Sequence, residues 1–181
     1  FNPSGDVNKF GGRFKYSKVL NVIDNIDKAI TSNITRVRMR RNLNALVNQF
    51  AQYELCFGNQ FNVKPEGLNI KSTGFKIQGQ AETLFFTDVP NADKITGTIS
   101  IVRKNASGET IIVVKSAGIV DYVHGEINLS TVNITSTDKP NNIIEVQAFP
   151  ESNDVIGLQD LYLDFNIPSS QINMVKDTIT S

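Results

Sequence analysis

The stretch that decides the fold is Gly118-Ile-Val-Asp-Tyr-Val-His-Gly-Glu-Ile-Asn-Leu129. Its two ends are rich in aliphatic and β-branched residues, which favour strands. The residues between them, Val123-His124-Gly125, have the composition of a tight turn. We therefore predict two short strands folded back on each other, with the glycine at positive φ. The only histidine of the chain then lies at a solvated turn tip rather than in a buried cleft.

This turn also carries the best candidates for chemistry. Asp121, His124 and Glu126 are residue types that bind several metal ions. We favour a structural turn, because turn residues are commonly polar for local reasons. A hydrolase that uses His124 with an aspartate would also need a nucleophile and oxyanion donors. The sequence contains neither a Gly-x-Ser-x-Gly elbow nor a phosphate-binding P-loop. We predict no catalytic residue, no metal site and no cofactor, and a protein that is not an enzyme.

Composition bounds the class of protein. Of the 181 residues, 40% are hydrophobic and 20% are charged, which is typical of a globular domain. No apolar run approaches the roughly 20 residues that span a bilayer, so we expect no membrane insertion. Cys56 is the only cysteine, which excludes an intramolecular disulfide and a cysteine-based zinc site. The chain starts with Phe1-Asn-Pro-Ser-Gly5 and no Met, so we expect a fragment of a longer protein, without a signal peptide.

The first 74 residues divide into two predicted parts. Residues 1–14 are rich in glycine and proline, and we predict a linker or an extended arm. Residues 15–74 form a predicted helix-plus-strand subdomain. Its helix covers residues 16–32, where apolar residues recur at spacings of three and four. Ser17 is a candidate cap for this helix and Asn33 a candidate stop.

From residue 75 the sequence changes character. Residues 75–181 contain many short segments rich in β-branched and aromatic residues, separated by Gly, Pro, Asn and Asp. We predict a mainly antiparallel β meander, sandwich-like in part, for this region. The predicted class of the whole chain is α+β, with an N-terminal helix plus strands before the β-rich region.

The sharpest charge feature is the run Arg36-Val-Arg-Met-Arg-Arg41. Residues 34–41 alternate with period two, which predicts a strand with a basic face made by Arg36, Arg38 and Arg40, while Arg41 follows on the other side. The run could contact an acidic protein surface, form a solvated strand face or contact phosphates. We favour a subunit interface, because Arg pairs bidentately with carboxylates.

Charge is unevenly distributed along a chain of zero net charge. Residues 1–60 carry nine Lys or Arg against four Asp or Glu, a balance of +5, and residues 61–181 carry the opposite balance of −5. Such asymmetry favours association between complementary surfaces. A neutral total argues against general affinity for nucleic acid. We therefore expect a second copy or a sister subunit as the partner, and no nucleic acid.

Several phrases, taken in order, resemble a known family. They are Phe10-Gly-Gly-Arg-Phe-Lys-Tyr-Ser-Lys18, Val22-Ile-Asp-Asn-Ile-Asp27, Ile30-Thr-Ser-Asn-Ile-Thr-Arg-Val-Arg-Met-Arg-Arg41, Gly118-Ile-Val-Asp-Tyr-Val-His-Gly125, the segment from Ile143 to Pro150, and Asp160-Leu-Tyr-Leu-Asp164. Together they resemble the C-terminal part of the baseplate wedge protein of T-even-type contractile-tailed phages, the ring-forming product of gene 6. Asp121, Tyr122 and Gly125 form the phrase that looks most like a fold signature of wedge proteins.

The resemblance implies a structural subunit of the virion, without catalysis. It implies a protein that dimerises, contacts other baseplate wedge proteins and links wedges into a ring around the central hub. It also implies rearrangement on sheath contraction, a location in the tail baseplate and assembly in the host cytoplasm. Ring closure has a physical requirement in an isologous contact and a second, distinct one.

A rival interpretation is a β-rich binding module, such as a carbohydrate-binding or protein adhesin domain. The absence of Trp argues against a sugar platform, although 4 Tyr and 11 Phe remain.

Overall fold

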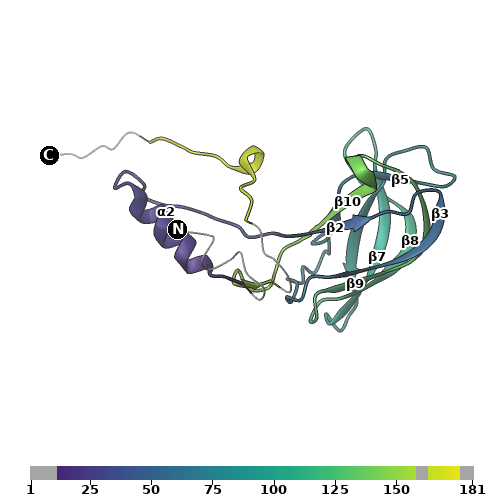
Figure 1. Cartoon of the computed structure of the whole chain (residues 1–181), viewed down its shortest axis with the longest axis horizontal. Coiled ribbons are helices and arrows are strands. Elements are labelled where there is room, and N and C mark those ends of the chain that lie inside the picture. The colour runs from purple at the N-terminus through teal and green to yellow at the C-terminus, as the bar shows by residue number, and fades with distance from the viewer. Residues whose placement is uncertain (1–11, 158–162, 176–181) are drawn as a thin grey trace.

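The computed structural model describes residues 12–157 and 163–175. Antiparallel sheets form a β-rich body, and the one α-helix of the described residues, α2 (Tyr16–Ile26), stands away from it (Figure 1). The predicted antiparallel, strand-rich character is confirmed. The α+β class holds only loosely, because this single helix buries none of its residues. Among the described residues, no helix is long and apolar enough to cross a membrane.

The strands form two main sheets and a small ribbon. The larger sheet has the order β3 (Gln49–Cys56), β9 (Glu126–Thr137), β8 (Thr110–Asp121), β7 (Thr96–Lys104) and β6 (Phe85–Pro90), with β5 (Phe75–Ile77) also paired to β9. The second sheet has the order β2 (Met39–Asn44), β10 (Ile143–Ala148) and β4 (Lys71–Ser72). The ribbon pairs β1 (Arg13–Phe14) with β11 (Val155–Ile156). Two short 3-10 helices, η1 (Pro140–Asn142) and η2 (Ile167–Ser169), complete the elements.

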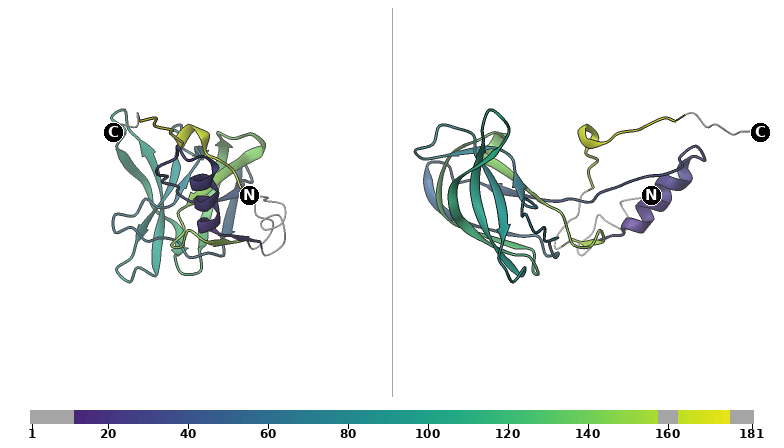
Figure 2. Two further views of the ribbon diagram at one scale, coloured as in Figure 1. Left: turned by 90° about the vertical axis from the view of Figure 1, so that its left-hand side faces the viewer. Right: turned by 180° about the vertical axis from the view of Figure 1, so that it is seen from behind.

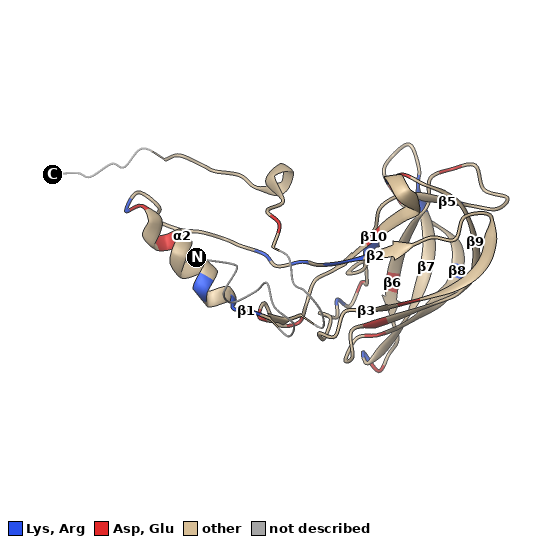
Figure 3. Ribbon diagram, in the orientation of Figure 1, with Lys and Arg blue, Asp and Glu red and all other residues tan. Residues whose placement is uncertain are grey.

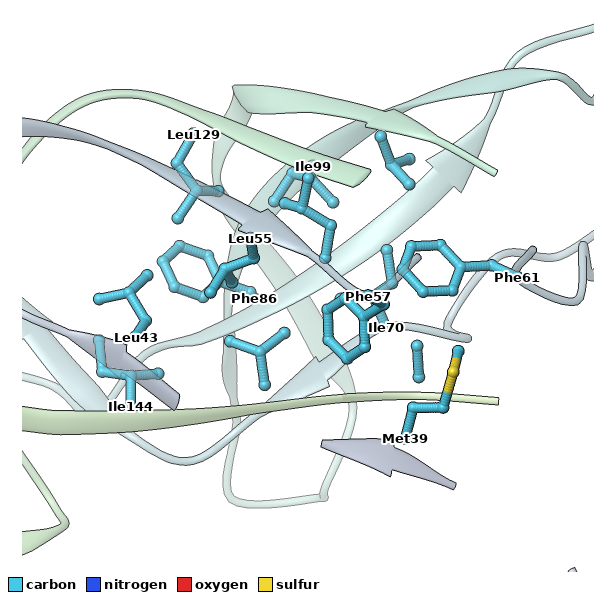
Figure 4. Close-up of a cluster of buried hydrophobic side chains, with 14 of the residues drawn as sticks. Met39, Leu43, Leu55, Phe57, Phe61, Ile70, Phe86, Ile99, Leu129 and Ile144 are labelled. Atoms are coloured by element: carbon cyan, nitrogen blue, oxygen red, sulfur yellow. The ribbon is translucent and has the colours of Figure 1, made fainter. Parts of the chain in front are cut away.

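The core lies between the two main sheets. Alternate residues of β2 and β10 point inward, so that Leu43, Ile144 and Val146 are buried. Figure 4 shows Leu43 and Ile144 across from Leu129, Leu55 and Phe86 of the larger sheet. The packed interior is the main source of stability, because burial of each large aliphatic side chain contributes about 1.5–3 kcal/mol.

Strands from both sides of residue 75 share the sheets. β2 pairs with β10 over six residues, and β3 pairs with β9. The regions 15–74 and 75–181 are therefore joined by backbone hydrogen bonds in both main sheets, and the division between them stays a prediction. Of residues 1–14, predicted as a linker or an extended arm, only residues 12–14 lie in the described part, and Arg13–Phe14 form β1.

The predicted helix is too long, and the strand after it starts too early. The helix ends at Ile26 rather than at residue 32, because Asp27 adopts an extended conformation and its side chain accepts the amide N–H of Ala29 at 2.8 Å. Neither Ser17 nor Asn33 caps it, since Lys15 and Asp27 are the terminal residues.

The strand predicted over residues 34–41 begins only at Met39. Met39 pairs with Ala148, the last residue of β10, and Pro150 follows two residues later without an N–H to donate. Residues before Met39 therefore have no ladder partner. The β-rich region predicted over residues 75–181 has no strand in residues 163–175, while residues 161 and 162 lie outside the described part.

The predicted hairpin at Gly118–Leu129 is present. β8 and β9 pair from Gly118↔Leu129 to Asp121↔Glu126, and the four residues between them form the turn. Gly125 has φ +68, the left-handed conformation that glycine adopts without strain. A Cβ at this position would lie 2.0 Å from the carbonyl oxygen of Asn59, so the turn is packed tightly against a neighbouring loop.

We predict that Gly125→Ala destabilises the fold more than Gly108→Ala does. Both glycines have positive φ, which costs an L-residue about 1–2 kcal/mol. Only at Gly125 does the added Cβ collide with backbone, whereas at Gly108 nothing lies within 4 Å. Urea unfolding of the two variants measures the difference. Equal losses of unfolding free energy would contradict the tight packing of this turn.

Candidate interaction surface

The turn at residues 122–125 is fixed to the loop that follows β3. The carbonyl oxygens of Tyr122 and Gly125 accept the amide N–H groups of Phe61 and Phe57, both at 2.8 Å. The amide N–H of Tyr122 donates to the carbonyl of Ile95 at 2.9 Å. The backbone of the predicted signature therefore joins three segments that are far apart in sequence.

Tyr122 is fully buried and forms a polar contact inside the core. Its hydroxyl donates to Oδ2 of Asp88 at 2.8 Å, and Oδ1 of the same carboxylate accepts the N–H of Ile70 at 2.7 Å. Burial, together with the neighbouring carboxylate, raises the pKa of Tyr122 above its ordinary value, so the hydroxyl keeps its proton. Gly97 leaves room for the ring, since a Cβ there would lie 2.6 Å from the Tyr122 hydroxyl.

His124 and Asp121 lie on the exposed side of the same turn. Asp121 accepts the backbone N–H of His124 at 2.9 Å, and its other oxygen lies 2.8 Å from Nδ1 of the ring. The backbone hydrogen bond and the side-chain contact hold the pKa of Asp121 below its ordinary value. The same side-chain contact, with the negative charge of Asp121, raises the pKa of His124. The pair therefore orders the turn, and the imidazole is largely exposed.

A single asparagine connects this turn region to the base of the projecting segment. The side chain of Asn59 accepts the N–H of Ile156 at 2.9 Å and donates to the backbone carbonyl of Ile156 at 2.7 Å. β11, which contains Ile156, pairs with β1, and both Phe14 and Val155 are buried. Two elements at the base of α2 are thereby held to the body.

The segment beyond this base, residues 16–38, is here called the arm. It consists of α2 and an extended stretch that returns to β2, and Figures 1 and 2 show it projecting from one end of the body. The arm closes on itself through the Tyr16 hydroxyl, which donates to the carbonyl of Thr35 at 2.6 Å. Asp154 accepts the first helical N–H at 2.8 Å, where a carboxylate also favours the helix dipole.

The arm leaves apolar side chains in solvent. Tyr16 and Val19 pack against the edge of the core, but Ile26 is 74% exposed and Ile34 is 91% exposed. Exposed apolar residues that gather on one projecting element are typical of contact surfaces.

The predicted basic face is largely where the alternation places it. Arg36, Arg38 and Arg40 are exposed, while Arg41 is half-buried on the other side. Figure 3 shows this charge along the stretch that leads into β2. The Arg38 guanidinium lies 4.8 Å from the centre of the Phe149 ring, and Arg40 lies 3.6 Å from Glu145. Within the described residues, Arg36 has no ion pair.

The arrangement suits recognition better than chemistry. In the described part of the chain, no three His, Cys, Asp or Glu residues gather in a way that could hold a metal ion. The structure places Asp121, Tyr122 and Gly125 together at the turn and the four arginines at the base of the arm. Asp88 and Asn59 were missed from sequence, because their partners lie 34 and 97 residues away.

A comparison with known protein families matches the segment that contains the arm. Residues 2–42 match the family model described as baseplate structural protein gp6, C-terminal domain III. A search of curated proteins finds no match. Over residues 2–42, the match agrees with the resemblance to a gp6-type baseplate wedge protein. It supports a structural role in the virion tail baseplate, in contact with other baseplate proteins, rather than an enzymatic one.

We predict that Tyr122→Phe destabilises the protein by on the order of 1–3 kcal/mol, because the buried Asp88 carboxylate loses a hydrogen-bond donor. The matched control is Tyr53→Phe, which removes only an exposed hydrogen bond from the amide of Leu46. Urea unfolding compares the two variants. A loss no larger for Tyr122→Phe than for Tyr53→Phe would show that the buried pair does not stabilise the fold.

The histidine titration gives a separate test of the turn. Since the pKa of His124 is raised and that of Asp121 is lowered, both groups are charged between those two pKa values, and their attraction is lost as pH rises through the pKa of His124. We expect an NMR titration midpoint above 6.5, the ordinary value, and a fall towards it in Asp121→Asn. As the only histidine, His124 gives one unambiguous signal. An unchanged midpoint in the variant would contradict the pairing.

Proposed function

We propose that this gp6-type chain is a structural subunit of the phage tail baseplate wedge that dimerises and links wedges into a ring around the central hub. The ring assembles in the host cytoplasm and rearranges when the sheath contracts. The arm and the basic run at its base form the contact surface between subunits. Asp121, Tyr122 and Gly125 act as a fold signature that holds the base of this surface in place.

One observation carries the proposal. The residues that match the baseplate family, 2–42, contain the whole arm, residues 16–38, and the first residues of β2. The helix of the arm, α2, has no buried residue. A segment that defines the family and contributes little to the core of its own chain is suited to contacts with other subunits.

The chemistry of the arm supports a protein partner. Exposed aliphatic side chains at Ile26 and Ile34 supply apolar area, and Arg36 and Arg38 supply charge on the same projecting element. The acidic excess of residues 61–181 makes a second copy an electrostatically complementary partner. An isologous contact of this kind gives dimers, and a second, distinct contact closes a ring.

We expect the chain to be at least dimeric at about 100 µM, since stable subunit interfaces usually bury about 1,600 Å². The double charge reversal Arg38→Glu/Arg40→Glu is expected to weaken the dimer at least tenfold, because it places acidic groups where the acidic partner surface binds. Sedimentation velocity over a concentration series measures both effects.

The matched control is Arg103→Glu, which changes the same residue type on the body. Arg103 pairs with Glu82 at 3.1 Å, much as Arg40 pairs with Glu145 at 3.6 Å, so each reversal disrupts one ion pair. The control is expected to leave association unchanged. A clean monomer for the unmodified chain would overturn the proposed dimer, and equal behaviour of the two reversals would remove the arginines from the interface.

A further inference from the structure

The larger sheet opens where β8 and β9 diverge. β8 pairs with β7 along most of its length, but it pairs with β9 only from Gly118 to Asp121. Beyond that point, β9 turns to β5 on the side where β8 would continue. In the described residues, Thr110–Ser116 therefore presents one strand edge without a partner strand.

A cavity of about 250 Å³ lies in this opening, here called the slot. Its walls include Val114, Val132 and Ile77, and it reaches down to the buried Ile101. Phe50 stands at its wall with 71% of its surface exposed. None of the described residues that line the slot is charged. A slot with apolar and uncharged polar walls beside an open strand edge has the features that take up an added strand.

The slot also contains an acceptor without a donor. Oδ1 of Asn133 is buried and has no hydrogen-bond partner among the described residues, while its Nδ2 donates to Gln78 at 3.0 Å. A buried acceptor left unpaired costs on the order of 1–3 kcal/mol.

The chain contains a segment with matching chemistry. Residues 171–175, Gln-Ile-Asn-Met-Val, are uncharged, and the first four alternate between polar and apolar side chains. The side chain of Gln171 donates to that of Asn173 at 2.7 Å, so these two amides lie on one side. Ile172 and Met174 are 92% and 95% exposed. By contrast, residues 34–38 carry two arginines, and an uncharged slot offers no group to pair with their charge.

In the structure, residues 171–175 lie far from the slot of their own copy. Figures 1 and 2 show residues 163–175 on the side of the arm, whereas β5 and the upper part of β8 lie at the opposite end of the body. A second copy can present the segment to the slot without rearrangement of either body.

We infer that residues 171–175 of one copy add as a strand to the β8 edge of a second copy, with Ile172 and Met174 in the slot. This inference rests on the proposed function, since it names a contact through which copies of the subunit join. Reciprocal exchange between two copies would give a closed, two-fold pair.

Disulfide trapping between copies tests the exchange. In a Cys56→Ser background, copies with Ser116→Cys, on the slot side of β8, are mixed with copies with Met174→Cys under mild oxidation, and mass spectrometry identifies the linked peptides. We expect a disulfide between the two kinds of copy. The matched control replaces Ser116→Cys by Ser152→Cys, an exposed position outside the slot, and is expected to give none. A second variant, Ile172→Asp/Met174→Asp, is expected to weaken association at least tenfold.

The outcomes separate this inference from the proposed function. A dimer that keeps its affinity in Ile172→Asp/Met174→Asp and gives no Ser116→Cys disulfide overturns the strand exchange and leaves the proposed subunit role intact. A disulfide within one copy, formed when both cysteines are placed in the same chain at high dilution, overturns the choice of a second copy. A monomer at about 100 µM overturns both the exchange and the dimer.

Discussion

The docking of the Tyr122–Gly125 turn onto residues 57–61 is the constraint on which the rest of the structure depends. Two backbone hydrogen bonds join the turn to this loop, and the contact of Gly125 with Asn59 leaves no space for a side chain. Asn59 then holds β11, and β11 pairs with β1 at the base of the arm. This turn thereby determines where the segment that matches the baseplate family leaves the body.

The buried Asp88–Tyr122 pair supports this constraint from inside. A carboxylate in a core is costly unless its oxygens are hydrogen-bonded, and here each oxygen has one donor. The hydroxyl that satisfies it belongs to the same turn whose backbone contacts the loop. Misplacement of the turn would therefore also remove one of the two hydrogen-bond donors of the buried Asp88 carboxylate, which couples the turn to the core more strongly than packing alone.

Sequence predicted the features that depend on neighbouring residues. The hairpin followed from strand propensity on either side of a glycine, and the alternation at residues 34–41 correctly separated exposed arginines from the inward Met39. Features that depend on distant partners could not be predicted. The strand begins at Met39 because β10 ends at Ala148, and the helix ends at Ile26 because Asp27 satisfies a nearby amide, although the apolar spacing continues to Ile30.

The central claim is that the arm is a contact surface of the assembled baseplate. Hydroxyl-radical footprinting of intact baseplates and of the isolated chain, diluted until it is monomeric, tests it most directly, because oxidation reports the solvent exposure of each side chain. The account predicts that Ile26 and Ile34 react readily in the isolated chain and are protected in the particle. Equal reactivity of both residues in the two samples would contradict it.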